Sequence, residues 1–239
     1  MRKIVLFFFT VISVLKIILT VEEELKFLAL PAPLPDFDMY VLSIQWGGTL
    51  CQSGNSHCHK KLNTIPKNIF TLHGLWPNLS NGNKMRKCNP GTDIKIVNDG
   101  SHIFTEMETY WISFTNEDPD FWSHEYNTHG YCYTQKYQIK DPKDYFQYAL
   151  EIYKRHDMAR LFHKTLGDVS GSHSFDMDDL FHHVGRATKG LIYELVCRNY
   201  NKRQFLQEIR FFFNLDMEAM DIGRKGNCDP SKPIIVEFQ

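Results

Sequence analysis

The sequence predicts one α+β domain, on three observations. Short runs of β-branched and aromatic residues are mixed with segments of helical periodicity, without the strict strand–helix alternation of a parallel sheet. Of the 239 residues, 43% are hydrophobic and 23% are charged, which is typical of a globular protein and excludes disordered, collagen-like and coiled-coil chains. No internal repeat, long linker or low-complexity tract divides the chain. We therefore expect a single domain after the N-terminal segment.

Strands are expected where β-branched and aromatic residues gather in short runs. The first two runs are bounded by Gly or Pro. The expected strands cover residues 40–46, 69–75, 191–197, 205–213 and 234–238.

Helices are expected where apolar residues recur at helical spacing or where start signals occur. Two segments open with an Asp-Pro pair, in which an N-cap acid precedes proline at the first helical position. Gly130 is a stop signal for the first of these two helices. The expected helices cover residues 101–115, 118–130, a segment starting at 141, and 176–189.

The N-terminus has the pattern of a secretory signal peptide. Arg2 and Lys3 precede an apolar run over residues 4–15, which is too short for a membrane-spanning helix of about 20 residues. We expect residues 1–32 to be the signal peptide and residues 33–239 to form a secreted domain with no membrane anchor. The alternative is that the apolar run is a single amphipathic anchor.

Six cysteines lie beyond the expected signal peptide. An even number in a secreted chain predicts three disulfides, and the count alone leaves 15 connectivities open. None is in a CxxC pair, so zinc-ribbon and thioredoxin-type sites have no support. Asn78 opens the single N-x-Ser/Thr sequon, which predicts an exposed, glycosylated loop.

The net charge of −1 excludes a sequence-wide electrostatic attraction to polyanions. A nucleic-acid partner would therefore need a local site.

The helix expected over residues 118–130 carries a group of side chains suited to proton transfer. At about 100° per residue, His124, Glu125, His129 and an aromatic ring share one arc of the helix. An imidazole gives or takes a proton near neutral pH, and a neighbouring carboxylate raises its pKa and orients it. The two histidines are five residues apart, whereas a zinc-protease helix needs H-E-x-x-H, so a zinc site is excluded.

A second candidate is His73 in the segment Phe-Thr-Leu-His-Gly-Leu-Trp-Pro at residues 70–77. We expect this histidine to leave a strand into a Gly/Trp/Pro turn, beside Trp76, whose ring is able to stack on a base.

Together the two segments resemble the active-site signatures of the T2 ribonuclease family, F-T-I-H-G-L-W-P and F-W-x-H-E-W-x-K-H-G-x-C. The first signature matches at seven of eight positions, with Leu72 in place of Ile. The second matches at Phe121, Trp122, His124, Glu125, His129, Gly130 and Cys132. The resemblance extends from about Phe37 to the C-terminus.

The resemblance implies a secreted endoribonuclease with a central antiparallel sheet, acting on single-stranded RNA without a metal or cofactor. The 2′-hydroxyl attacks the adjacent phosphorus, and the resulting 2′,3′-cyclic phosphate is hydrolysed to a 3′-phosphate. By this resemblance His129 is the base and His73 the acid. His124 holds the phosphate, and Glu125 orients a partner or assists at the phosphoryl oxygens.

The resemblance also implies which residues bind the substrate. Trp76 and Phe121 are expected to stack on bases, and Gln45 is a weaker candidate. Thr128 is the main departure, because the family has a lysine there and the helical wheel places it inside the catalytic arc. We expect a slowed enzyme, unless Lys136 or a distant arginine supplies the charge.

Within the family the chain looks similar to plant S-ribonucleases of gametophytic self-incompatibility. The Asn78 sequon follows the first signature as it does there. Three of the four disulfides of those proteins are implied: Cys51–Cys58, Cys88–Cys132 and Cys197–Cys228. The fourth is absent, with Phe212 near one expected half.

This resemblance implies a monomer with RNA as substrate, no DNA partner, and pollen recognition proteins as possible partners. The alternatives are an S-like ribonuclease of nutrition or defence, and an inactive relative that acts as a binding or storage protein.

Overall fold

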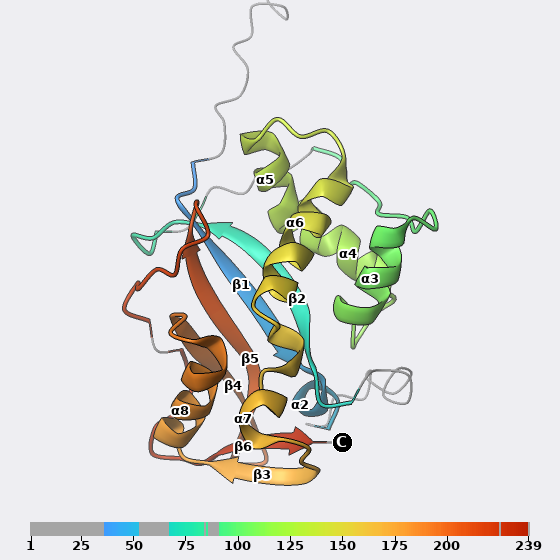
Figure 1. Cartoon of the computed structure of the whole chain (residues 1–239). Helices are drawn as coiled ribbons and strands as arrows, with labels where there is room; N and C mark the ends of the chain where they lie inside the picture. The colour runs from blue at the N-terminus through green and yellow to red at the C-terminus, as the bar shows by residue number, and fades with distance from the viewer. Residues whose placement is uncertain (1–35, 53–66, 84, 86–90, 225, 239) are drawn as a thin grey trace, which may run out of the picture. The chain divides into compact units, whose positions relative to one another are not determined.

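Six strands form one sheet in the part of the chain that the computed structural model describes, namely residues 36–52, 67–83, 85, 91–224 and 226–238 (Figure 1). The strands are β1 (Met39–Trp46), β2 (Phe70–Asn78), β3 (Gly171–Phe175), β4 (Tyr193–Tyr200), β5 (Arg203–Asn214) and β6 (Ile234–Phe238). Their order is β2-β1-β5-β6-β3, and β4 pairs with the edge of β5 opposite β1. The pairings are antiparallel except for a short parallel contact between β5 and β6, so the predicted antiparallel sheet is confirmed with one parallel contact added.

Helices from the middle of the chain pack on this sheet, and α6 contacts both β2 and α3 (Figure 1). The helices are α2 (Gly47–Gln52), α3 (His102–Tyr110), α4 (Asp118–Glu125), the π-helical η1 (Tyr126–Gly130), α5 (Tyr131–Lys136), α6 (Pro142–Arg155), the 3₁₀-helical η2 (Met158–Arg160), α7 (His163–Leu166) and α8 (Met177–Thr188). Helices and strands thus alternate irregularly, which confirms the α+β prediction.

The two faces of the sheet differ in chemistry because side chains alternate along each strand. The even-numbered residues of β1 belong to the main hydrophobic core, together with buried side chains of α6. On the opposite face, Met39 and Val41 of β1 form a small apolar cluster with Phe212 of β5. Beyond that cluster this second face turns polar, with Ser43 and Gln45 both buried. The polar face is where the candidate site lies.

The strand expected over residues 69–75 is longer than predicted and continues past His73 without a turn. It runs through Trp76 and Pro77 to Asn78, so the turn predicted after His73 is wrong. The pairing with β1 skips one residue there, because Gly74 lies opposite Ser43 and Leu72 lies opposite Ile44. His73 is therefore the extra residue of a β-bulge, a feature that re-aims a side chain.

The helix expected over residues 118–130 also differs from the prediction, because Gly130 does not stop it. The α4, η1 and α5 segments follow one another without a break over residues 118–136, and Gly130 has a helical φ of −63°. A Cβ built on Gly130 would lie 2.6 Å from the ring of Tyr145. The glycine thus allows close packing of the π-helical turn against α6.

Two further elements, α3 and β3, also differ from the sequence prediction. The helix expected over residues 101–115 ends at Tyr110 as α3, and Trp111, its C-cap, donates its indole N–H to the His73 carbonyl at 2.9 Å. The strand β3 is not predicted by the sequence, because its five residues are mostly exposed and lack β-branched side chains.

The cysteines agree with the expected disulfides as far as the described residues reach. Cys197 and Cys228 form a disulfide. Cys51 and Cys132 are each disulfide-bonded. Their expected partners Cys58 and Cys88 lie outside the described residues, as does the expected signal peptide over residues 1–32. Among the described helices none has the length and apolar character needed to cross a membrane.

Candidate active site

His73 lies between two buried carboxylates on the polar side of the sheet. Its Nδ1 is 2.9 Å from Oε1 of Glu208, which comes from β5. Its Nε2 is 3.7 Å from Oε1 of Glu125, which comes from α4. Both glutamates are almost fully buried, whereas the imidazole is partly exposed. The arrangement leaves one edge of a paired imidazole open to a ligand.

Gly74, next to the bulge in β2, allows Glu125 to come close to His73. A Cβ built on Gly74 would lie 2.3 Å from Oε2 of Glu125 and 2.3 Å from Nε1 of Trp76. Those two atoms are joined by a hydrogen bond of 2.9 Å, in which the indole donates to the carboxylate. Only glycine at position 74 therefore lets the helix carboxylate reach across the strand to His73.

Glu208 is held by two side chains besides that of His73. Its Oε2 accepts hydrogen bonds from Ser43 of β1 at 3.1 Å and from two guanidinium nitrogens of Arg210 at 2.8 and 2.9 Å. Arg210 also reaches Glu194 of β4 at 3.4 Å. The carboxylate that faces His73 is thus fixed in place on the sheet before any ligand binds.

The electrostatics of the three groups follow from burial and pairing. Burial disfavours a charged imidazole, but the hydrogen bond to Glu208 and the negative charge of Glu125 outweigh it, so the pKa of His73 is raised. Burial would also raise the pKa of Glu208, but His73 and Arg210 lower it to about 2. Burial dominates at Glu125 and raises its pKa to about 7. Near neutral pH, Glu208 is therefore ionised and Glu125 is partly protonated.

The second histidine of the site contacts the same indole ring as His73. The rings of His129 and Trp76 are 5.3 Å apart with an interplanar angle of 31°, and His73 meets Trp76 edge-on at 5.0 Å. Phe121 lies 5.8 Å from the His73 ring. Arg210 lies over the Trp76 ring at 5.2 Å. The structure therefore gathers two imidazoles, two carboxylates and one guanidinium around Trp76.

Three residues predicted for the site lie differently from the rest. His124 is exposed on α4. Gln45 is buried, and its amide nitrogen donates to the carbonyls of Leu72 and Ile112. It therefore supports the backbone beneath the site, in contrast to the substrate contact that the sequence predicted. Thr128 is half-buried and makes no hydrogen bond to a site residue among the described residues.

Glu208 and Arg210 were missed by sequence reasoning. They come 135 and 137 positions after His73, so local spacing does not connect them with it. A signal was present: an acid and a base two residues apart share one face of a strand whose other residues are largely apolar. Lys136, one of the cations considered from sequence, is engaged elsewhere, because its Nζ contacts the Phe37 carbonyl and lies over the Phe37 ring.

A cavity of about 480 Å³ borders the site on the β4 side. Arg210 forms part of its wall, so the side chain that holds Glu208 also borders this cavity. Its lining residues are Glu194, Val196, Arg210, Arg224, Gly226 and Asn227. In the described part of the chain, no group of three or more His, Cys, Asp or Glu side chains is arranged to hold a metal ion.

Comparison with known proteins identifies one family. Residues 37–228 match the model of the Ribonuclease T2 family. A curated relative from Emericella nidulans, described as ribonuclease T2-like, is 29% identical over 197 residues, which cover 72% of this chain and 45% of that protein. The chain spans about half the length of the first curated relatives it matches.

Solved structures show the same fold. A mutant of RNase MC1, a protein from bitter gourd seeds, in complex with 5′-UMP matches with a TM-score of 0.65 and 20% identity, over 85% of this chain and 99% of that one. The SF11-RNase of Nicotiana alata, associated with gametophytic self-incompatibility, matches with a TM-score of 0.60 and 20% identity, over 85% and 100% of the two chains.

Proposed function

The chain belongs to the ribonuclease T2 family, and we propose that it is an endoribonuclease that cleaves single-stranded RNA by transphosphorylation. The observation that carries this proposal is the pairing of His73 with two carboxylates, together with a second imidazole, His129, that contacts the same Trp76 ring. Two imidazoles at one site supply the acid and the base that this reaction needs.

In the proposed reaction His129 removes the proton of the ribose 2′-hydroxyl. The 2′-oxygen then bonds to the adjacent phosphorus, the bond from phosphorus to the 5′-oxygen breaks, and His73 protonates that leaving oxygen. The products are a 2′,3′-cyclic phosphate and a free 5′-hydroxyl. In a second step water opens the cyclic phosphate to a 3′-phosphate, with the two imidazoles exchanging roles. The raised pKa of His73 supports its role as the acid, because that role requires a protonated ring.

The two glutamates would serve His73 in different ways. Glu208, ionised and held by Arg210, accepts a hydrogen bond from Nδ1–H of His73, so that Nε2 carries the proton given to the leaving oxygen. Glu125, with its pKa raised to about 7, is partly protonated near neutral pH and so is able to donate a hydrogen bond to a phosphoryl oxygen. Negative charge develops on those oxygens in the transition state, where fixed donors are most effective.

A matched set of histidine variants tests the proposal. Purified protein would be assayed on single-stranded RNA and on a dinucleoside monophosphate, with product analysis for the cyclic phosphate. His73→Ala and His129→Ala should each abolish cleavage of both substrates. His102→Ala removes an exposed histidine of α3 and should leave the rate unchanged. Cleavage by a folded His73→Ala protein at the wild-type rate, or loss of activity on adding EDTA, would refute the proposed mechanism.

For the biological role we propose a secreted, monomeric style ribonuclease of self-incompatibility. The expected signal peptide, the Asn78 sequon close behind the first signature, and the fold shared with the Nicotiana alata protein support this role. Expression confined to the style is the measurement that tests it, and binding to pollen recognition proteins would follow.

Two alternatives rest on specific observations. The formal net charge of −1 favours an S-like ribonuclease of nutrition or defence, since S-ribonucleases are usually basic. Thr128 in place of the family lysine favours a catalytically silent binding or storage protein. A zymogram on RNA separates that second alternative from an enzyme in either role.

A further inference from the structure

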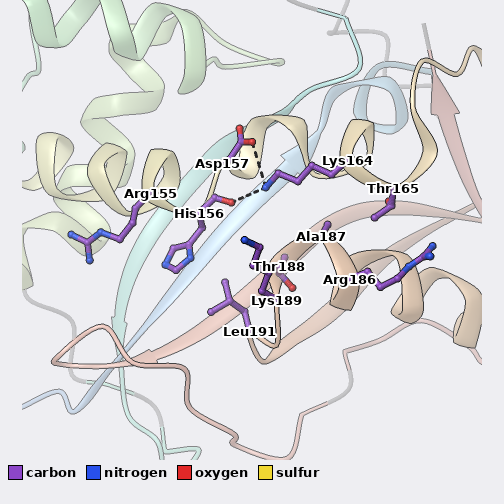
Figure 2. A pocket seen from close by; sticks show the side chains of 10 residues that line it. All are labelled: Arg155, His156, Asp157, Lys164, Thr165, Arg186, Ala187, Thr188, Lys189 and Leu191. Atoms are coloured by element: carbon purple, nitrogen blue, oxygen red, sulfur yellow. Dashed lines mark hydrogen bonds and ion pairs between the residues drawn. The ribbon is translucent and has the colours of Figure 1, made fainter.

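A basic cleft lies between the C-terminal ends of α6 and α8 (Figure 2). Its volume is about 800 Å³, which is within the range of ligand-binding clefts. Four cationic side chains line it against a single acid, Asp157. The cations are Arg155, Lys164, Arg186 and Lys189. In a chain with a net charge of −1, such a surplus in one concave place is a local feature that attracts anions.

The surplus is not neutralised within the protein. Asp157 is already shared, because it pairs with Arg160 at 3.1 Å and with Lys164 at 3.5 Å. Among the described residues, Arg155, Arg186 and Lys189 form no ion pair with a carboxylate. The cost of gathering like charges here is relieved when an anion binds between them.

The cations are spread along the cleft. In Figure 2, Arg155 and Arg186 lie at opposite ends, and Lys164 and Lys189 lie between them on opposite walls. A single phosphate would meet only the middle pair. An extended polyanion, with a phosphate at each repeat, would meet all four.

The remaining lining suits a nucleic-acid strand as well. The half-buried ring of His156 and the side chain of Leu191 supply a flat and an apolar surface. Single-stranded RNA sites combine positive charge with such surfaces for the bases.

The cleft is separate from the candidate active site. The ring of His156 lies 5.6 Å from that of Phe213, which belongs to the main core, whereas Glu208 and Arg210 point to the opposite face of β5. A short substrate at His73 therefore does not reach it.

We propose that this cleft is a second binding site for the phosphate backbone of single-stranded RNA, remote from the bond that is cleaved. The proposal rests on the proposed ribonuclease activity, since the same long RNA would occupy both places. It gives long RNA an affinity that a dinucleotide lacks.

The test compares a triple variant in the cleft with a triple variant of equal charge outside it. The first is Arg155→Gln/Arg186→Gln/Lys189→Gln. The control is Lys140→Gln/Lys202→Gln/Arg203→Gln, at exposed positions outside the cleft lining. Binding is measured by fluorescence anisotropy with a 2′-O-methyl RNA of about 20 nucleotides. This RNA lacks the hydroxyl nucleophile and stays intact during the measurement.

The cleft variant should bind this RNA at least about tenfold more weakly than wild type, and the slope of log affinity against log salt should fall by about 2, as loss of three phosphate contacts predicts. Its rate on a dinucleoside monophosphate should equal that of wild type, which also shows that it is folded. Equal RNA affinity and salt slope in the cleft variant and the control would overturn the proposal. If neither RNA nor dinucleotide is cleaved by wild type, the proposed activity fails, while the anisotropy still decides whether the cleft binds RNA.

Discussion

Replacing Glu208 by Gln tests how the site controls the proton of His73. The carboxylate oxygen lies 2.9 Å from Nδ1. At that distance an ion pair in an effective dielectric constant of about 20 is worth on the order of 5 kcal/mol, before the opposing cost of burial is subtracted. The amide keeps a hydrogen-bond acceptor, worth about 1 kcal/mol, but loses the charge. The pKa of His73 should therefore fall, while the orientation of the ring is retained.

The consequence for catalysis has a definite sign. The acid must be protonated, so the alkaline limb of the rate–pH profile should move to lower pH in Glu208→Gln. At pH 7 we expect kcat to fall by about 10- to 100-fold, within the range that general acid catalysis contributes. The assay is the initial rate on a dinucleoside monophosphate from pH 4 to pH 9.

Glu194→Gln is the matched control, because Glu194 pairs with the same Arg210 but does not contact His73. Its alkaline limb should stay where the wild-type limb is. A folded Glu208→Gln protein with an unshifted profile would refute the reasoning. An equal shift in both variants would show that the effect passes through Arg210 instead of through the direct pair.

Three further predictions concern other parts of the site. Thr128→Lys should raise kcat on single-stranded RNA by at least about tenfold, which corresponds to roughly 1.4 kcal/mol of barrier. The reason is that the charge of Arg210 is already balanced by two carboxylates. An unchanged kcat in a folded variant would mean that the missing charge is supplied elsewhere. Burial raises the pKa of Glu125 from 4.5 to about 7, so the free energy of unfolding of the wild type falls as pH rises through that window. Glu125→Gln lacks this loss and should become more stable than wild type between pH 5 and pH 8, by up to about 3 kcal/mol in urea unfolding. An equal pH dependence in both proteins would contradict this. Peptide mapping without reduction should pair Cys88 with Cys132, a link worth about 4 kcal/mol in the chain-entropy model, and a different partner for either cysteine would exclude it.

Local patterns were enough to predict most of the sheet and the helices. The five expected strands are all present, and the Asp-Pro start signals correspond to the first turns of α4 and α6. Gly130 shows why such signals fail. Its sequence context is that of a helix stop. In the structure, however, the ring of Tyr145 fills the space that a side chain at position 130 would need, and this contact depends on tertiary packing that local sequence does not encode.

The residues of the candidate site likewise fall into those that local sequence predicts and those that only the fold brings together. His73, Glu125 and His129 were predicted because they lie in two short segments whose residues are neighbours in sequence. Glu208 and Arg210 come from the far end of the chain, and only the pairing of β5 with β1 brings them to His73. The exposure of His124 follows from the packing of α4, which a helical wheel does not contain.

Two interruptions of regular structure meet at this site, and each is a single extra residue. In β2 the core side chains Leu72 and Leu75 are three positions apart, so removal of one residue between them would restore an even alternation. In the helix, the π-helical turn of η1 would become an ordinary α-turn by the same kind of loss. The deletion in β2 would restore the alternation of the strand, whereas the deletion in η1 would turn the residues after it by about 100° relative to α6. A related chain that keeps the fold but lacks the proposed RNA cleavage is therefore expected to carry its one-residue gap in β2, beside His73.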